Sequence, residues 1–179
     1  MPSSSSFFPQ SEGPAIINGT DGNDRLNVFE FEFSEINTGA GNDLVRSFFA
    51  SDDVINTGSG NDIVDAGGGD DVIDAGTGVN QVFSGSGADT FVFSSEFFFS
   101  NNNLTFVGDL TAEDQIDLSA ANISFADLES NGDGVLNNSD DNVRDDGTSI
   151  YLEFGNNDIE LYNPDDSLPE LTEDLFLFA

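Results

Sequence analysis

Aspartate recurs at nearly regular intervals through the first half of the chain, and its carboxylate can bind a metal ion or act as an acid or base in catalysis. The 179 residues include 35 acidic side chains but no histidine and no cysteine. The commonest general base, thiol nucleophiles, disulfides and the usual zinc and iron ligands are therefore excluded. Carboxylate and carbonyl oxygens remain, and these favour hard cations such as calcium.

The charge of the chain is strongly unbalanced. Three arginines and no lysine face the acids, which gives a formal net charge of −32. Such a surface repels nucleic acid and anionic membranes, so neither is expected as a partner, and divalent cations would relieve the repulsion. The alternative is a solvated acidic surface of the halophilic kind. No apolar run approaches the ~20 residues of a membrane span.

An apolar residue returns every nine or ten positions between residues 17 and 91. An acid or a small polar residue lies two positions before it, and glycine often lies four positions before it. The apolar residues are Ile17, Leu26, Ile36, Val45, Ile55, Val64, Ile73, Val82 and Phe91. The polar residues that precede all but the first of them are Asp24, Ser34, Asp43, Asp53, Asp62, Asp71, Asn80 and Asp89.

This period predicts a coil of short parallel strands. So many glycines would destabilise a helix, and a disordered linker has no reason to keep a regular apolar residue. A unit of a six-residue turn and a three-residue strand, with the central strand residue pointing inward, fits the spacing. Two units complete one turn of the coil, and glycine is needed because turn residues must adopt positive φ.

The repeat units "GTDGNDRLN", "TGAGNDLVR", "TGSGNDIVD", "AGGGDDVID", "AGTGVNQVF" and "SGSGADTFV" resemble the nonapeptides of the RTX (haemolysin-type calcium-binding) family. The resemblance covers about residues 15–92. Two further units, at 29–37 and 48–56, keep the spacing but have lost their glycines. The resemblance implies a mainly β fold, a calcium-binding parallel β-roll of nonapeptide repeats capped by a small α+β C-terminal region.

In that family calcium lies between turns that stack on the same edge of the roll, bound by turn carbonyls and sixth-position carboxylates. Edge one would carry the turns 19–24, 38–43, 57–62 and 75–80, and edge two the turns 29–34, 48–53, 66–71 and 84–89. The expected ligands on edge one are Gly19, Thr20, Asp21, Gly22, Asp24, Thr38, Gly39, Ala40, Gly41, Asp43, Thr57, Gly58, Ser59, Gly60, Asp62, Ala75, Gly76, Thr77, Gly78 and Asn80. Those on edge two are Gly67, Gly69, Asp71, Ser84, Gly85, Ser86, Gly87 and Asp89.

We expect about four ions in the roll, since each needs six or more oxygens. Edge one would hold three, with the last, between Asp62 and Asn80, weaker because Asn80 adds no charge. Edge two would hold one between Asp71 and Asp89. A further edge-two ion between Asp53 and Asp71 stays open, and none is expected between Ser34 and Asp53.

The two glycine-poor turns carry Phe29, Phe31, Phe33, Phe48 and Phe49 instead. We expect this part of edge two to bulge and bury its aromatic side chains within the protein. The alternative is a strand that presents an aromatic stripe to a partner.

The second half lacks the repeat. Residues 94–103 read as a loop, 104–110 and 115–120 as short strands that cover the end of the roll, and 148–154 and 158–163 as a β-hairpin. The "IDLS" at 116–119 and the tail at 168–179 resemble the C-terminal region of type I secretion substrates, where the tail is an uncleaved signal. Packing of the tail as a last strand is compatible with that role.

Residues 129–140 resemble an EF-hand or dockerin-like loop. Glu129, Asn131, Asp133, Val135 (through its carbonyl) and Asp140 occupy positions one, three, five, seven and twelve, with Gly134 at the bend. One calcium ion is expected there, and an Asx-rich surface loop is the alternative. The segments 125–129 and 139–144 would each be a helical turn.

These features predict three parts: a flexible N-terminal lead-in (1–14) without the features of a signal peptide, the β-roll (15–93), and a C-terminal capping and secretion region (94–179). The expected function is that of a secreted, non-enzymatic calcium-binding protein that folds outside the cell, at the cell surface or in the extracellular space. Type I secretion machinery is the expected export partner. Alternatives are a head-to-tail filament or matrix subunit, self-associating through the uncapped N-terminal end of the roll, and a non-catalytic calcium-dependent module of a secreted enzyme system.

Overall fold

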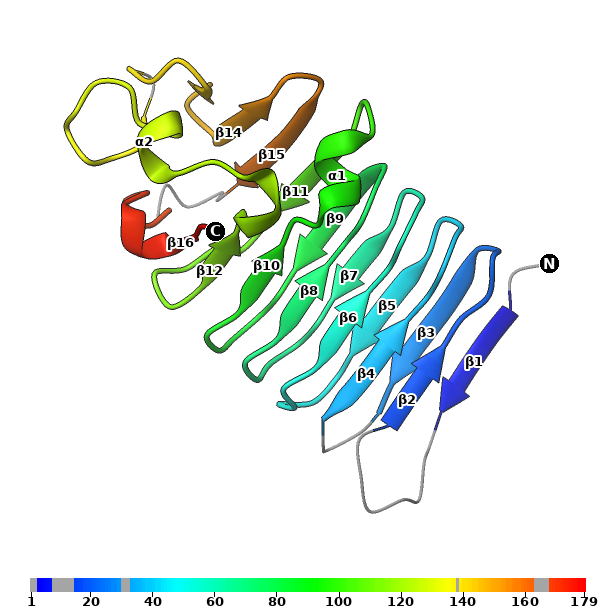
Figure 1. The fold of residues 1–179 in the computed structure, drawn as a ribbon. Coiled ribbons are helices and arrows are strands. Elements are labelled where there is room, and N and C mark those ends of the chain that lie inside the picture. The colour runs from blue at the N-terminus through cyan, green and yellow to red at the C-terminus, as the bar shows by residue number, and fades with distance from the viewer. Residues whose placement is uncertain (1–2, 8–14, 30–32, 138, 163–167) are drawn as a thin grey trace.

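Successive short strands alternate between two facing sheets. The computed structural model describes residues 3–7, 15–29, 33–137, 139–162 and 168–179. Nine strands form sheet A, in the order β1 (Ser3–Phe7), β3 (Asp24–Val28), β5 (Leu44–Ser47), β7 (Ile63–Asp65), β9 (Val79–Phe83), β11 (Leu104–Val107), β15 (Asn157–Tyr162), β14 (Ser149–Phe154) and β13 (Val143–Asp145). Seven form sheet B, in the order β16 (Phe176–Leu177), β12 (Gln115–Asp117), β10 (Thr90–Val92), β8 (Val72–Asp74), β6 (Val54–Asn56), β4 (Ser34–Asn37) and β2 (Ala15–Asn18). This is the parallel β-roll predicted from the repeat (Figure 1).

The recurring apolar residues fill the space between the sheets, as predicted. All nine are buried, and the most exposed of them, Ile17, is only 6% exposed. The parallel register places like residues side by side, so that Val45 lies opposite Val64 and Val64 opposite Val82. Each repeat therefore adds one aliphatic side chain to a continuous row, which explains why the period is so strict.

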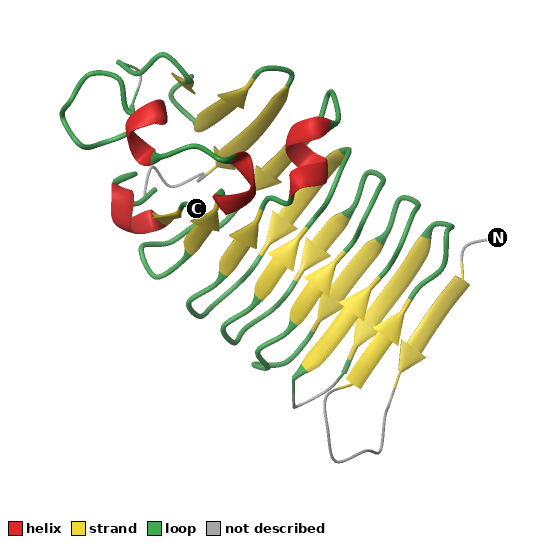
Figure 2. Ribbon diagram, viewed as in Figure 1, coloured by secondary structure: helices red, strands yellow, loops and turns green. Residues whose placement is uncertain are grey.

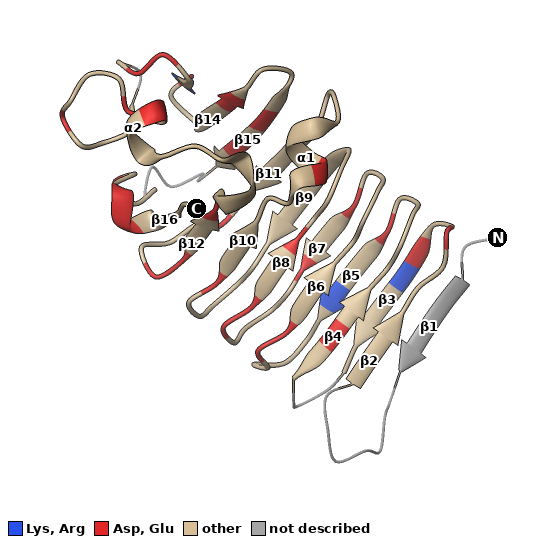
Figure 3. Cartoon of the chain, viewed as in Figure 1, with Lys and Arg blue, Asp and Glu red and all other residues tan. Residues whose placement is uncertain are grey.

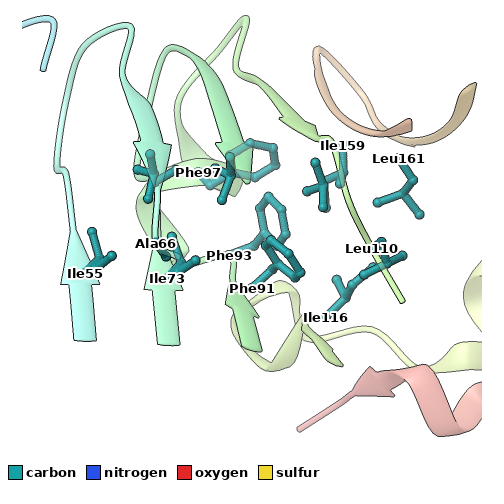
Figure 4. Close-up of a cluster of buried hydrophobic side chains, with 14 of the residues drawn as sticks. Ile55, Ala66, Ile73, Phe91, Phe93, Phe97, Leu110, Ile116, Ile159 and Leu161 are labelled. Carbon is teal, nitrogen blue, oxygen red and sulfur yellow. The ribbon is translucent and has the colours of Figure 1, made fainter. Parts of the chain in front are cut away.

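The core continues past the last repeat. Phe91 pairs with Ile116, and Ile116 with Phe176, so the sheet B row extends to the C-terminal strand. Phe93 and Phe97 pack against each other with ring centroids 5.0 Å apart, and Figure 4 shows them between the repeat core and the C-terminal residues Ile159 and Leu161. Residues 94–179 thus extend both sheets and close one end of the roll.

Several C-terminal expectations are confirmed. The predicted strands are β11 and β12, the predicted hairpin is β14–β15, and the first predicted helical turn is α2 (Phe125–Leu128). The tail forms a 3₁₀ turn (Glu173–Leu175) and then β16, which packs on β12 as a last strand. Another 3₁₀ turn, Ser119–Ala121, follows β12. The helical turns gather at this end of the molecule, as Figure 2 shows.

Three expectations were wrong. The segment expected to be a loop contains the helix α1 (Ser95–Phe99), because burial of Phe97 outweighs the weak helix propensity of aromatic residues. Residues 143 and 144, expected at the end of a helical turn, belong to β13, since its backbone pairs with β14. Part of the expected flexible lead-in forms β1, which pairs in parallel with β3 and covers the edge that β3 would otherwise expose.

The Phe-rich turns are only partly buried, which corrects the expected burial of their aromatics. Phe29 and Phe48 stack with centroids 4.8 Å apart, yet Phe48 is 52% exposed and Phe33 is 40% exposed. The turns lie outside the two sheets, and Phe33 and Phe48 are therefore exposed. Phe31 lies outside the described residues. No helix in the described part of the chain is long and apolar enough to cross a membrane.

Candidate calcium sites on the turn edges

The turns stack on two edges in the predicted way. Turns at 38–43 and 57–62 lead from sheet B to sheet A, and those at 48–53 and 66–71 lead from sheet A to sheet B. Short parallel bridges join successive turns on each edge, at Ala40 and Ser59 on one and at Ala50 and Gly68 on the other. Figure 3 shows acidic residues concentrated in these turns. The geometry therefore brings turns two units apart into direct contact.

Backbone stacking this close requires glycine. Gly60 has φ +145° and Gly78 has φ +116°, and a Cβ built at either would overlap the carbonyl oxygen of the glycine one turn below. First-position threonines add to the stack, since the hydroxyl of Thr38 donates to the Thr57 carbonyl and that of Thr57 to the Ala75 carbonyl, both at 3.0 Å. Glycine thus serves two needs here, positive φ and close approach.

The sixth-position acids form a hydrogen-bonded ladder along each edge. On edge one, Asp43 Oδ1 accepts the amide of Asp24, and Asp62 Oδ1 accepts the amide of Asp43, both at 2.8 Å. On edge two, Asp71 Oδ1 accepts the amide of Asp53 at 2.7 Å, and Asp89 Oδ1 accepts that of Asp71 at 2.8 Å. One oxygen of each acid therefore fixes the neighbouring turn.

The other oxygen of four of these acids has no hydrogen-bond partner. The Oδ2 atoms of Asp43, Asp62, Asp71 and Asp89 are buried and unpartnered, and none of these residues is more than 3% exposed. A buried carboxylate oxygen without a partner is expensive, because neither water nor a donor replaces its lost hydration. A cation bound between the turns would compensate it.

Burial also raises the pKa of four sixth-position carboxyls, those of Asp53, Asp62, Asp71 and Asp89. Burial raises the pKa of Asp62 to about 6, against the lowering effect of the hydrogen bond from Asp43. Burial raises the pKa of Asp71 to about 7, and repulsion from Asp53 and Asp89 adds to the rise. Burial also raises the pKa of Asp53 and of Asp89. Negative charge on these four carboxyls is therefore disfavoured until a cation compensates it.

Asp53 and Asn80 differ from the four acids with an unpartnered oxygen. Asp53 Oδ2 accepts a hydrogen bond from the Ser51 hydroxyl at 3.1 Å. Asn80 Oδ1 accepts the amide of Asp62 at 3.0 Å, and its Nδ2 donates to the Ala75 carbonyl at 2.8 Å. Neither presents an unpartnered oxygen, in keeping with the weaker sites expected beside them.

A second ladder, at the fifth turn position, was not foreseen from the sequence. On edge one the Oδ1 atoms of Asn23, Asn42 and Asn61 each accept an amide of the next turn at 2.9 Å. On edge two Asp52 accepts the amide of Asp70 at 2.8 Å, and Asp70 that of Ala88 at 2.9 Å. The signal was the repeated Asn or Asp just before the sixth-position acid. This ladder runs in the opposite direction to the first.

Two further acids extend edge two beyond the repeats. Asp114 Oδ1 accepts the amide of Asp89 at 2.9 Å, and the two oxygens of Asp109 accept the amides of Ser84 and Gly85 at 3.0 and 2.9 Å. Burial raises the pKa of Asp109, helped by repulsion from Asp114 and Asp89. The sequence signal was that Asp114 precedes β12 as Asp89 precedes β10.

The EF-hand-like loop is held by its own amides. Asp140 accepts the amide of Ser130 through Oδ1 at 2.7 Å and that of Asn137 through Oδ2 at 2.9 Å, while Glu129 accepts that of Asp133 at 2.8 Å. Burial raises the pKa of Asp140, but these backbone hydrogen bonds outweigh it and the pKa lies below its ordinary value. Asn131 and Asp133 accept the amides of Asp133 and Val135, at 2.8 and 3.0 Å.

Nowhere in the described residues do three or more acidic side chains gather to hold one ion. An ion on the turn edges must therefore take many of its oxygens from turn carbonyls, with at most two carboxylates. This is the ligand set that the repeat resemblance implies, and calcium accepts it because it binds carbonyl and carboxylate oxygens together.

Fold and turn edges together define a parallel β-roll whose stacked turns suit a hard cation. Residues 11–28 and 49–91 match the RTX calcium-binding nonapeptide repeat, in four copies. The chain thus carries an RTX calcium-binding repeat domain.

Solved structures agree on the fold. The AlgE6R3 subunit of the Azotobacter vinelandii mannuronan C5-epimerase superposes with a TM-score of 0.51 at 25% identity, over 97% of this chain and 87% of that one. The AlgE6R2 subunit of the same enzyme gives a TM-score of 0.50 at 22% identity, over 96% of this chain and 97% of that one. No curated protein matches the chain in sequence.

Proposed function

We propose that this chain is a secreted, non-enzymatic calcium-binding module that folds when it meets calcium outside the cell. The unpartnered, buried Oδ2 atoms of Asp43, Asp62, Asp71 and Asp89 carry the proposal. Without a cation the stacked carboxylates repel one another, and the glycine-rich turns lose much conformational entropy on ordering. Calcium binding would supply the missing free energy.

About four ions would occupy the roll, each held by carbonyls of two stacked turns and by sixth-position acids. The residues proposed are those expected from the sequence on edges one and two. A fifth ion, in the loop 129–140, would bind only if the carboxylates of Glu129 and Asp140 gave up their hydrogen bonds from backbone amides and coordinated the metal instead. Calcium titration of Asp140→Asn tests that site alone.

A non-enzymatic role is supported by the way the acids are used. The carboxylates of Asp43, Asp53, Asp62, Asp71 and Asp89 all serve the ladders between turns, where their hydrogen bonds explain the spacing better than acid–base catalysis does. The similarity to subunits of an epimerase favours one variant of the proposal, a calcium-dependent module of a secreted enzyme system. Export would use the type I machinery, with residues 168–179 as the signal.

Circular dichroism and calorimetric titration test the proposal. In EDTA the chain should be largely disordered, and millimolar calcium should produce a strand-rich spectrum with about four ions bound per chain. A spectrum already strand-rich in EDTA, unchanged by calcium, would contradict calcium-dependent folding.

Head-to-tail assembly is the second candidate. β2 is the edge strand of sheet B, and Ile16 on it is 60% exposed. An exposed edge can pair with another copy, and an edge lysine disfavours this pairing. Ile16→Lys should keep the chain monomeric in calcium while leaving it folded. Ile17 is buried in the core and is not suitable for such a test. Sedimentation showing the unmodified chain as a monomer in calcium would remove this candidate.

A further inference from the structure

Asparagine is followed directly by glycine at two places in the chain, Asn18–Gly19 and Asn131–Gly132. The two residues of such a pair can react with each other, because the backbone nitrogen of the glycine can attack the side-chain amide carbon of the asparagine and close a succinimide ring. Glycine favours this reaction, since it has no Cβ to block the approach and its backbone rotates easily. The structure places the two pairs in different surroundings.

The first pair lies within the β-roll. Asn18 ends β2 opposite Asn37 of β4, and the Gly19 amide donates to the Asn37 carbonyl at 2.8 Å. A Cβ added to Gly19 would lie 2.5 Å from the carbonyl oxygen of Thr38, so the backbone is closely packed here. Ring closure at Asn18 would therefore break the pairing between successive turns of the roll.

The second pair lies in the loop 129–140. Asn131 and Gly132 are both exposed, Gly132 has φ +83°, and nothing lies within 4 Å of a Cβ added to it. The amides of Asn131 and Gly132 donate to carboxylates, those of Asp140 at 3.3 Å and Glu129 at 2.5 Å, and the pair lies outside the strands. The backbone therefore has room to rotate without breaking a sheet.

Both reacting groups of the second pair already have the hydrogen bonds that ring closure needs. Glu129 Oε1 accepts the Gly132 amide, so a base contacts the proton that the attacking nitrogen must lose. Asn131 Oδ1 accepts the Asp133 amide, which polarises the side-chain carbonyl and stabilises the negative charge that develops on its oxygen. The Asp133 amide donates to Glu129 Oε1 as well, at 2.8 Å to each oxygen, and so holds the base beside the group that is attacked.

We propose that Asn131 is a site of covalent self-modification, at which the side-chain amide is lost with Glu129 as the base. The Gly132 nitrogen attacks Cγ of Asn131 while its proton passes to Glu129. The bond from Cγ to the side-chain nitrogen then breaks, and Glu129 returns the proton to that nitrogen, which leaves as ammonia. Water opens the succinimide at either carbonyl, and this gives aspartate or isoaspartate and releases a proton.

The modification changes the loop in which it occurs. Aspartate would place a charged oxygen at the third position of the loop, where EF-hand loops carry a calcium ligand, whereas isoaspartate lengthens the backbone by a methylene group. The consequence for calcium rests on the site proposed for this loop. The modification itself does not, because it needs only Glu129, Asn131, Gly132 and water.

Peptide mapping by mass spectrometry, on the folded, calcium-loaded full chain incubated at neutral pH, tests this. Asn131 should lose its amide at least about tenfold faster than Asn18, and about tenfold faster than it does itself in urea with EDTA. In urea with EDTA the two pairs should react at similar rates, since unfolding removes the difference in their surroundings. A rate at Asn131 that is lower in the folded chain than in urea would overturn the proposal.

The variant Glu129→Gln tests the base. Glutamine keeps a side-chain oxygen that can accept the Gly132 amide but cannot take its proton, so the folded chain should react about tenfold more slowly, while the rate in urea should not change. Asp141→Asn removes an exposed acid of the neighbouring segment and should leave the rate within about twofold. Both variants must show the calcium-induced dichroism spectrum of the unmodified chain. An unchanged rate in folded Glu129→Gln, or an equal loss in Asp141→Asn, would show that Glu129 is not the base.

Discussion

Five sixth-position aspartates on the turn edges, Asp43, Asp53, Asp62, Asp71 and Asp89, use their two carboxylate oxygens differently. One accepts an amide of the neighbouring turn and sets the stacking, while the other, in Asp43, Asp62, Asp71 and Asp89, has no protein partner. Asp53 also accepts an amide of the neighbouring turn, that of Ser34, through Oδ1, but its Oδ2 accepts a hydrogen bond from the Ser51 hydroxyl. The contrast separates the structural function of the acid from its proposed metal-binding function.

Replacing Asp62 should therefore weaken calcium binding more than replacing Asp53. Asp62→Ala and Asp53→Ala each remove one ladder hydrogen bond, from the amides of Asp43 and Ser34 at 2.8 Å, but only Asp62→Ala removes an unpartnered oxygen. We expect the calcium midpoint to rise about tenfold for Asp62→Ala, the effect of losing roughly 1.4 kcal/mol, and less for Asp53→Ala. Calcium titrations followed by dichroism measure both. Equal shifts would show that the unpartnered oxygen is not a ligand.

The sixth-position acids could be found from sequence because they keep a fixed spacing from a buried residue. The fifth-position Asn and Asp also recur, but the repeat alone does not show what they bind, since Asn61 and Asp70 are exposed and their amide partners lie in another turn. The function of Asp109 was harder still to predict, because it accepts the amide of Ser84, which lies 25 residues away in the sequence. Repetition shows which residue types recur, but only the three-dimensional stacking shows which amide each one accepts.

At the scale of the element, the strands that were predicted correctly are those in which every repeat places an equivalent residue in the same structural position. Ile36, Ile55 and Ile73 occupy the same place in successive strands of sheet B, so one pattern describes them all. α1 and β13 each depend on a single tertiary arrangement, the burial of Phe97 and the pairing with β14. No local sequence pattern predicts such tertiary contacts.

The turn glycines should differ in importance according to what lies beside them. Gly60 (φ +145°) meets the Gly41 carbonyl, whereas Gly147 (φ +91°) has nothing within 4 Å of an added Cβ. Gly147→Ala should lose about 1 kcal/mol of stability from backbone strain alone. Gly60→Ala should lose at least about twice that, because strain and overlap add. Urea unfolding in saturating calcium compares them, and similar losses would show that the stack relaxes easily.

For the whole molecule, the large negative charge makes folding depend on which cation is present. Calcium accepts the many carbonyl and carboxylate oxygens of two stacked turns in a flexible geometry, whereas magnesium prefers a small octahedral shell and gives up water reluctantly. Millimolar magnesium should therefore induce much less strand signal than the same concentration of calcium. Sodium chloride at equal ionic strength controls for simple screening. Full folding in magnesium would mean that the edges need only charge neutralisation.

Acid should partly replace calcium. Burial raises the pKa of Asp62 to about 6 and that of Asp71 to about 7, both above the ordinary 3.8. A raised folded-state pKa means that the fold prefers the protonated acid, so the stability from these groups is complete below about pH 4 and is lost as the pH rises through 6 to 7. Relief of repulsion among the other acids acts in the same direction.

The calcium-free chain should accordingly gain strand signal as the pH falls from about 8 to 5, a range that spans the raised pKa values of these acids. In calcium the effect should reverse, because protons compete with the ion for the same oxygens and the midpoint for calcium should rise as the pH falls. Dichroism titrations in EDTA and in calcium, at low protein concentration to limit aggregation, give both curves. A calcium-free chain equally disordered at pH 5 and pH 8 would show that neutralising the edge acids is not sufficient, and that the ion must bridge the turns for the roll to form.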